Sequence, residues 1–439
     1  MNPGGGSRGA GWMAAGGASG SRFLWRSFAS FENANYRRFF FGQSVSLIGT
    51  WMQSVAQSWL VLELTGSGTA LGLVVAVQTL PVLLLAPYGG VLADRADKRR
   101  LLLATQATLG LLALTLGLLT LFHVVQLWMV LVIAAALGLA NAVDNPTRQA
   151  FVPEMVGPEH VANAVSLNSV MTNAARAIGP AVAGVLIVTA GVSGCFLINA
   201  GSFAAVLVAL ATMNPSALHP TKVVAQGPGQ IIEGLRYVRR TPRLLTPLLM
   251  MALIGALAYE FQVVLPLLAK RTFHGNADAY GYLTAAFGIG AVAGGIVVAS
   301  RRPKGLHAVA VAAASFGIAL LAASVAPTFS LELVALAFVG AASVTFMSRG
   351  NTTLQLAAAA QMRGRVMALW AVAFIGTTPI GGPIVGYVAQ HAGPRWGLAL
   401  GGLAALLATA LAAYPYYRRA VRHPPAPGSD QLPPGAGPT

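Results

Sequence analysis

The feature that most constrains this chain is a long series of apolar stretches, each able to cross a bilayer as a helix. Such a helix needs about 20 consecutive, mainly apolar residues. Of the 439 residues, 56% are hydrophobic and only 9% are charged, too few charges for a soluble protein to cover its core with polar surface. The sequence therefore predicts an all-α integral membrane protein with twelve transmembrane helices. We expect these helices at residues 38–62, 70–93, 101–122, 126–148, 163–190, 194–213, 244–270, 279–300, 306–326, 330–356, 365–390 and 395–417.

The basic residues indicate how the helices are oriented. Lys and Arg number 28 against 12 Asp and Glu, and they occur in short runs between the apolar stretches. Cytoplasmic loops collect positive charge, and a cytoplasmic N-terminus places nearly every run on that side, with Lys270, Arg271 and Arg395 as external exceptions. Both termini are therefore expected in the cytoplasm, with the chain in a bacterial cytoplasmic membrane. Charge this dispersed does not predict a nucleic-acid-binding domain.

The composition also divides the chain into segments. The tails 1–35 and 420–439 are rich in Gly, Ser or Pro and are expected to be disordered. Six helices fall in 36–213 and six in 244–419, and the hydrophilic linker 214–243 joins them. The linker has one apolar helical face that predicts a short helix on the membrane surface. Its residues are Ile231, Ile232, Leu235 and Val238.

The two halves resemble each other at an offset of roughly 205 residues, as internal repeats do. Three landmarks recur in the same order in both halves. They are Gly89-Gly90 with Gly294-Gly295, Asn145 and Gln149 with Asn351 and Gln355, and Gly179-Pro180 and Gly184 with Gly382-Pro383 and Gly386. Two pseudo-symmetric six-helix halves describe the major facilitator fold, whose substrate site lies between the halves near the middle of the membrane.

The loop after the second helix carries the most specific motif. A glycine there permits close helix packing, and the following carboxylate can meet a helix N-terminus or an arginine. The motif resembles the loop signature of the major facilitator superfamily, in which the loop latches one transport state, so it is expected to act as a gate. Its residues are Gly90, Asp94, Arg95, Lys98 and Arg99. The usual second glycine is Asp97 here, and plain anchoring by positive charge is the alternative.

The fifth helix contains Gly179-Pro180 followed by Gly184, which is similar to a motif of the antiporter branch of this superfamily. The physical reading is a bend and a close helix contact that seals the transport path. Gly and Pro are common in membrane helices, so ordinary packing is the alternative.

From Asn33 to about Arg422 the chain further resembles the transmembrane secretion effector family of bacterial exporters. Stretches such as Phe39 to Leu60, Asn145 to Pro153 and Arg363 to Met367 carry the likeness. The resemblance implies export of small amphipathic molecules, such as siderophores, macrolides or other drugs, in exchange for protons. One departure is that residues 126–140 lack the intramembrane arginine of many drug–proton antiporters.

Two charged residues fall inside predicted helices, where a charge costs roughly 2.5–3.5 kcal/mol unless it has a partner or a wet cavity. Glu260 follows Tyr259 in the seventh helix, and it is either the proton carrier or half of a structural pair. Arg176 in the fifth helix shares a polar stripe with Asn173. Arg176 is expected to pair with Glu260 or Asp144, or else to hold an anionic group of the substrate.

The first helix carries a polar stripe with alternating spacings of three and four. Its residues are Gln43, Ser46, Thr50, Gln53 and Gln57. Since polar groups avoid lipid, this face is expected to line the central cavity together with Tyr259, interhelical packing being the alternative. Asn141 and Asp144 lie at the cytoplasmic end of the fourth helix, where Asp144 is expected to pair with Arg148 and to serve in gating.

Several kinds of chemistry are not indicated. No phosphate-binding Gly-Lys loop, nucleophile motif or metal-ligand spacing is present, so no enzyme activity, metal or cofactor is expected. Glu63 and Glu332 are expected to be solvated at external helix ends, and the single Cys195 to be a small buried hydrophobe. The leading hypothesis is a monomeric secondary exporter. The alternatives are a lipid or lysophospholipid transporter of the same fold and a non-transporting sensor or scaffold.

Overall fold

The structure is a computed structural model that describes residues 29–219, 230–300, 305–359 and 361–422. Every regular element in these residues is a helix, and most of the tails 1–35 and 420–439 lies outside them. The elements are η1 (Ala29–Glu32), α2 (Ala34–Thr65), α3 (Gly68–Arg95), α4 (Lys98–Leu121), α5 (Leu127–Val156), α6 (Val161–Ala211), η2 (Pro215–Ala217), α7 (Gln230–Arg240), α8 (Pro242–Ala258), α9 (Phe261–Leu267), η3 (Leu268–Thr272), α10 (Ala277–Ser300), α11 (Leu306–Ser324), α12 (Phe329–Ala357), α13 (Arg363–Ile375), α14 (Thr378–His391) and α15 (Pro394–Arg422).

These elements form the twelve membrane helices that the sequence predicts. Ten helical stretches in the described residues are long and apolar enough to cross a bilayer. One of them, α6, contains two spans, because Gly191 breaks it with a left-handed φ of 73°. The polar, 32-residue α2 supplies the twelfth. Helix 7 consists of α8, α9 and η3, and helix 11 consists of α13 and α14.

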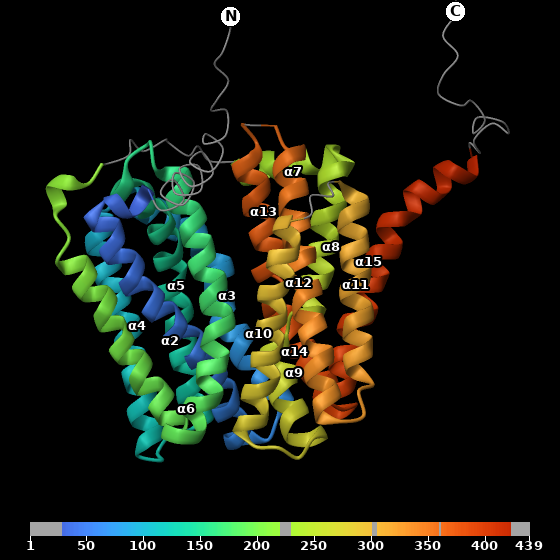
Figure 1. Ribbon diagram of the computed structural model, residues 1–439, viewed down its shortest axis with the longest axis horizontal. Helices are drawn as coiled ribbons and strands as arrows, with labels where there is room; N and C mark the ends of the chain where they lie inside the picture. The colour runs from blue at the N-terminus through green and yellow to red at the C-terminus, as the bar shows by residue number, and fades with distance from the viewer. Residues whose placement is uncertain (1–28, 220–229, 301–304, 360, 423–439) are drawn as a thin grey trace, which may run out of the picture.

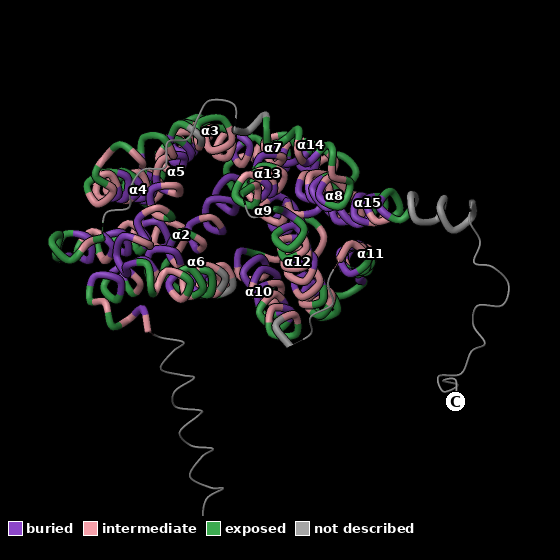
Figure 2. The backbone as a smooth tube through the Cα atoms, turned by 90° about the horizontal axis from the view of Figure 1, so that it is seen from above, coloured by how far each residue is buried: buried purple, intermediate pink, exposed green. Residues whose placement is uncertain are grey.

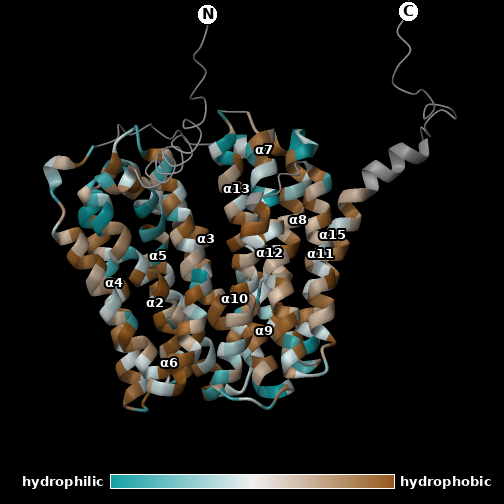
Figure 3. Cartoon of the chain, in the orientation of Figure 1, coloured by the Kyte–Doolittle hydropathy of each residue, from teal (hydrophilic) through white to brown (hydrophobic). Residues whose placement is uncertain are grey.

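The bundle has two halves, α2–α6 and α8–α15, which lie side by side in Figure 1. Figure 2 shows them from above, with α3 beside α14 and α6 beside α10 at the seams. Both ends of the described chain, the α3–α4 loop and α7 lie at the end of the bundle that is uppermost in Figure 1. We name this the basic end and the opposite one the far end. Figure 3 shows hydrophobic residues dominating the middle of the helices and hydrophilic ones concentrated towards both ends.

Small residues hold the helices together in the same way in both halves, which confirms the repeat. A Cβ added at Gly89 would overlap the Ala142 carbonyl oxygen, and one added at Gly294 would lie 2.5 Å from the Ala341 carbonyl oxygen. These contacts join α3 to α5 and, correspondingly, α10 to α12. Gly90, expected to permit close packing, instead has no atom within 4 Å of an added Cβ. The tight contact therefore belongs to Gly89, one residue earlier.

This difference predicts opposite effects for two neighbouring substitutions. Gly89→Ala should lower the free energy of unfolding by about 1–3 kcal/mol, because the methyl group has no space. Gly90→Ala should raise it by about 0.5–1 kcal/mol, because alanine restricts the unfolded backbone and meets nothing in the fold. A thiol-reactive dye that fluoresces when the buried Cys195 becomes accessible reports thermal unfolding of both variants. Equal shifts of the two midpoints would contradict the packing assignment.

The helix in the linker, α7, packs against the second half. Val238 is buried at 1% exposure, and Arg365 of α13 lies 2.8 Å from Glu233 in an ion pair. Leu235 is exposed, and the side chains of Ile231 and Ile232 lie outside the described part of the chain. Part of the apolar face that the sequence assigned to the membrane surface thus contacts α8 and α13 instead.

Candidate functional site

Helix 7 is interrupted at its most polar point. The helical pattern ends at Ala258 and resumes at Phe261, so Tyr259 and Glu260 lie in the break. Glu260 is 5% exposed, and its Oε1 has no hydrogen-bond partner. Its carboxylate forms a hydrogen bond with the side chain of Thr378, the first residue of α14. A buried carboxylate with one unpaired oxygen is costly, so its charge must depend on a proton or on a rearranged partner.

Arg176 forms neither of the two expected pairs. Among the described residues no ion pair includes it, and its Nε is buried without a hydrogen-bond partner. The guanidinium lies over the ring of Trp51, 5.1 Å from its centroid, and interacts electrostatically with Tyr259. The side chain of Asn173, predicted on the same stripe, lies outside the described part of the structure. Arg176 is therefore a cation near the middle of the bundle whose neighbours are aromatic.

Tyr259 connects helix 7 to α12. Its hydroxyl donates a hydrogen bond of 2.9 Å to the Ser343 carbonyl oxygen. The ring packs against Phe316 and Phe374, with centroids 5.2 and 5.1 Å away. The ring of Tyr259 and the cation of Arg176 thus meet where the halves face each other, whereas the carboxyl of the adjacent Glu260 bonds to Thr378 within the second half.

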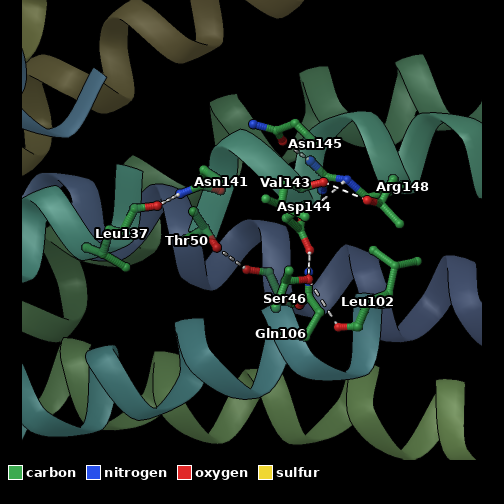
Figure 4. A network of polar contacts seen from close by, with 12 residues as sticks. Ser46, Thr50, Leu102, Gln106, Leu137, Asn141, Val143, Asp144, Asn145 and Arg148 are labelled. Atoms are coloured by element: carbon green, nitrogen blue, oxygen red, sulfur yellow. Dashed lines mark hydrogen bonds and ion pairs between the residues drawn. The ribbon is translucent and has the colours of Figure 1, made fainter. Parts of the chain in front are cut away.

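Asp144 belongs to a network inside the first half, shown in Figure 4. It is 2% exposed and accepts hydrogen bonds from Thr105 Oγ1 (2.7 Å) and Gln106 Nε2 (2.8 Å) of α4. Arg148 Nε lies 3.9 Å from its Oδ2, which confirms the predicted pair. Asn141 donates to the Leu137 carbonyl oxygen of its own helix. Asp144 therefore joins α4 to α5 within the first half.

The polar stripe of α2 does not form one cavity-lining face, and that expectation needs correction. Gln53 is 6% exposed and accepts a 2.6 Å hydrogen bond from Asn199 of α6. Gln57 is equally buried and donates to Gln78 of α3 over 3.1 Å. Gln43 is also buried, and Thr50 alone of the stripe's predicted site residues is exposed. Helical spacing correctly places these groups on one side, but neighbouring helices of the same half cover most of them.

The loop between α3 and α4 is anchored within the first half. Asp97, which replaces the usual glycine, caps α4 by accepting a 3.0 Å hydrogen bond from the Arg100 amide. Lys98 pairs with Glu154 at 2.9 Å, and Arg99 donates to the carbonyl oxygens at the end of α6. Asp94 is half-buried and Arg95 exposed. A cap and an ion pair thus replace the turn that a glycine would provide.

The far end holds a set of contacts between the halves that sequence reasoning missed. Arg271 Nη2 donates to the Gly66 carbonyl oxygen (2.6 Å) and to Gln390 Oε1 (2.9 Å), which also accepts from the Gly68 amide (2.7 Å). Lys270 donates to the Leu62 carbonyl oxygen at 3.4 Å. We call Arg271, Gln390, Gly66 and Gly68 the far-end clasp. The only sequence signal was that Lys270 and Arg271 broke the charge rule.

Two glycine crossings join the halves, one at each seam of the bundle. A Cβ on Gly184 would lie 2.8 Å from the Cα of Gly281, where α6 crosses α10. In the other half the corresponding Gly386 meets the Gly68 carbonyl where α14 crosses α3. Gly179 packs on the Cβ of Trp51. The Gly179-Pro180-Gly184 motif thus makes the close contacts expected of it, one of them across the seam.

Two acidic residues at the far end differ. Glu63 is exposed and accepts a 2.6 Å hydrogen bond from the Trp59 indole. Glu332, expected in solvent, is instead fully buried, and neither carboxylate oxygen has a hydrogen-bond partner. Its position in the first turn of α12 suggested water, but sequence does not show that neighbouring helices cover that turn. The described residues contain no group of three or more His, Cys, Asp or Glu arranged to hold a metal ion.

Comparison with known proteins decides the family. The family model described as "Transmembrane secretion effector" matches residues 25–428. The chain belongs to the transmembrane secretion effector family. It is therefore a multi-pass membrane transporter of the major facilitator type, with small molecules as substrates, and is not an enzyme.

Named relatives of this family member are transporters too. It is 31% identical to the staphyloferrin A transporter of Staphylococcus aureus, over 65% of this chain and 72% of that one. It is 26% identical to the multidrug efflux pump Tap of Mycolicibacterium fortuitum (79% and 87% covered). The enterobactin exporter EntS of Escherichia coli is 25% identical (80% and 84% covered).

Solved structures share the fold at low sequence identity. A bacterial homologue of the lysosomal transporter Spinster, in an inward-facing conformation, superposes with a TM-score of 0.68 at 13% identity, covering 90% of this chain and 96% of that one. A bacterial homologue of the iron transporter ferroportin, also inward-facing, gives 0.65 at 16% identity, covering 87% and 98%.

Proposed function

We propose that this transporter exports small amphipathic molecules of the drug, macrolide or siderophore type across the bacterial cytoplasmic membrane, in exchange for protons. The observation that carries the proton coupling is Glu260, a buried carboxyl with an unpaired oxygen in the break of helix 7. Broken helices near the midplane are where transporters of this architecture bind substrates and coupling ions. The printed names of its relatives support export and the class of cargo.

The orientation in this proposal follows from the charge distribution. Since cytoplasmic loops collect Lys and Arg, the basic end faces the cytoplasm and the far end faces outward. The clasp and both glycine crossings then hold the outer end shut. The α3–α4 loop is bonded to its own half in this arrangement and acts as a latch when the cytoplasmic end closes.

The transport cycle works as a rocking of the two halves in a monomer. Cargo reaches the central region from the cytoplasm and lies near Arg176 and Tyr259. Opening of the far end then exposes Glu260 to protons from outside. Protonation neutralises its carboxylate while the cargo leaves. Return to the arrangement described here releases the proton to the cytoplasm. The exchange requires only that Glu260 be reachable from one side at a time.

Inverted membrane vesicles test this function. Uptake of amphipathic fluorescent dyes should require an imposed proton gradient, and Glu260→Gln should abolish the gradient-dependent part, since glutamine keeps the shape but carries no exchangeable charge. Glu332→Gln is the matched control, because it also removes a buried, unpaired carboxyl from the second half. This control should retain coupled uptake.

Two results would count against the proposal. Uptake that is independent of the gradient would remove proton exchange. Coupled uptake that survives in Glu260→Gln and disappears in Glu332→Gln would transfer the carrier role to Glu332.

A further inference from the structure

Helix 11 is interrupted as helix 7 is, and a hydrogen bond joins the two breaks. The helical pattern of α13 ends at Ile375, and that of α14 begins at Thr378. The side chain of Thr378 bonds to the buried carboxylate of Glu260. This bond is strongest while Glu260 is ionised, because hydrogen bonds to charged groups exceed neutral ones and a helix N-terminus favours an anion. The charge of Glu260 therefore attaches helix 7 to the start of α14.

The face of α14 that begins at Thr378 continues to the far end. It consists of residues spaced four apart, which share one side of a helix. They are Thr378, Gly382, Gly386 and Gln390. A Cβ on Gly72 of α3 would overlap the Gly382 carbonyl oxygen, and one on Gly68 would lie 2.8 Å from that of Gly386. Gln390 bonds to Gly68 and Arg271 in the far-end clasp. One face of α14 thus connects the Glu260 carboxylate with the contacts that close the α3 seam.

The carboxylate itself lies against this seam. A Cβ on Gly382 would be 3.5 Å from Glu260 Oε2 and 3.1 Å from the Gly72 carbonyl oxygen of the first half. On its other side, α11 and α15 present apolar residues across a small cavity that Glu260 helps to line. They are Leu320, Gly397, Leu398 and Gly401. These neighbours carry no charge that could act on Glu260.

The ionisable groups of the neighbouring elements interact elsewhere. Tyr259 bonds to Ser343 and faces Arg176, and Tyr280 of α10 stacks on Trp59. Lys270 and Arg271 of η3 and Arg395 of α15 donate to backbone carbonyl oxygens at the far end. No ion pair among the described residues includes Glu260. Thr378 is therefore the group through which the charge of Glu260 acts on α14.

An exchanger of cargo for protons needs such a connection. If the empty, ionised transporter opened at the far end, Glu260 would take up a proton there. The return would release that proton to the cytoplasm, and no cargo would have left. Protons would leak unless an interaction that depends on the ionised carboxylate keeps the empty transporter closed.

Resting on the proposed proton exchange, we propose that Thr378 is a positioning residue whose bond to ionised Glu260 holds α14 against α3 and keeps the far end of the cargo-free transporter shut. Cargo binding near Arg176 and Tyr259 then supplies the free energy that breaks this bond. Loss of the bond should therefore uncouple proton flow from cargo.

Proton entry into liposomes without cargo tests this role. The purified full chain is placed in phosphatidylcholine liposomes that contain the pH dye pyranine, with potassium and valinomycin to hold the membrane potential at zero. After external acidification, Thr378→Val should admit protons at least about tenfold faster than wild type, a factor that corresponds to about 1.4 kcal/mol. Thr378→Ser keeps the hydroxyl and should show the wild-type rate.

The preceding residue provides the matched control. Thr377 is half-buried as Thr378 is, but its hydroxyl donates to the Ala373 carbonyl oxygen of its own helix over 3.0 Å. Thr377→Val should leave proton entry unchanged. Combining Thr378→Val with Glu260→Gln should abolish the leak, because the leak requires the carboxyl as carrier. A merely structural defect at Thr378 would persist in the double variant.

A second measurement reports the far end directly. A cysteine introduced at Ser58, which is 5% exposed, reacts with a membrane-impermeant maleimide applied from the far-end side when that end opens. Without cargo, Thr378→Val should raise the labelling rate at least about tenfold. In a Glu260→Gln background the same substitution should have no further effect, since the two residues act as a pair.

The outcomes separate this proposal from the proposed function. Wild-type leak and labelling rates in Thr378→Val, in a transporter whose export is driven by the proton gradient, would overturn the role of Thr378 alone. Equal effects of Thr377→Val and Thr378→Val would do the same. Export that ignores the gradient, together with faster labelling in Thr378→Val that depends on Glu260, would remove proton exchange and keep the closing role of the bond.

Discussion

Gly184→Val should fold and insert normally yet transport at less than about a tenth of the wild-type rate. The reason is that the added Cβ would lie 2.8 Å from the Cα of Gly281 in the opposite half, a position that no side-chain movement can relieve. Overpacking costs about 1–3 kcal/mol, and here only the arrangement with the far end closed bears that cost. The equilibrium between the two arrangements should therefore shift by roughly 5–150-fold.

The same helix offers a control for this substitution. Gly201 also lies in α6, and an added Cβ there meets no atom within 4 Å. Gly201→Val should therefore keep both its expression level and its transport rate. Gly386→Val, at the corresponding crossing of α14 and α3, should behave as Gly184→Val does. Wild-type rates in both crossing variants would show that the crossings are not needed for closure.

Removing the clasp should shift the same equilibrium through hydrogen bonds. Arg271→Ala deletes three, to Gly66 and to the side chain and backbone of Gln390. Each contributes about 0.5–1.5 kcal/mol, and the solvent exposure of Arg271 favours the lower value. We therefore expect the far end to open about ten times more often.

The single buried cysteine makes this measurable. Cys195 is fully buried, so a cysteine introduced at Ser58, which is 5% exposed, would be the main reactive thiol. A membrane-impermeant maleimide applied from the far-end side should label it about tenfold faster in Arg271→Ala. Arg395→Ala is the control, because Arg395 is another far-end arginine but donates to Ala326 within its own half. Equal labelling rates in the two backgrounds would exclude a gating role for the clasp.

Much of the fold could be predicted because a membrane-spanning helix needs about 20 consecutive apolar residues, and such a stretch can be recognised from neighbouring residues alone. The twelve helices and the two halves followed from apolar length and recurring glycines. The crossing of Gly184 with Gly281 shows why the Gly-Pro motif was informative, since small residues mark close helix contacts wherever they occur.

The site was harder to predict, because helical spacing shows which side chains share a face and not which helix covers that face. Gln53 and Gln57 were correctly grouped, yet Asn199 and Gln78 bury them. The structure confirms the predicted ion pair of Asp144 with Arg148, which could be predicted because the two residues are four apart on one helix. The ion pairs predicted between Arg176 and Glu260 or Asp144 are not formed in the described part of the chain. Residue spacing within one helix does not give the distance to a residue on another helix.

The two glycine crossings also restrict how the molecule can move. They lie at opposite seams of the bundle, one joining α6 to α10 and the other joining α14 to α3. In the proposed cycle both contacts belong to the arrangement with the far end closed, so opening that end must separate them. If each half moves as a rigid body, the two seams must part together, and a crossing that stayed closed at one seam would leave the far end only partly open.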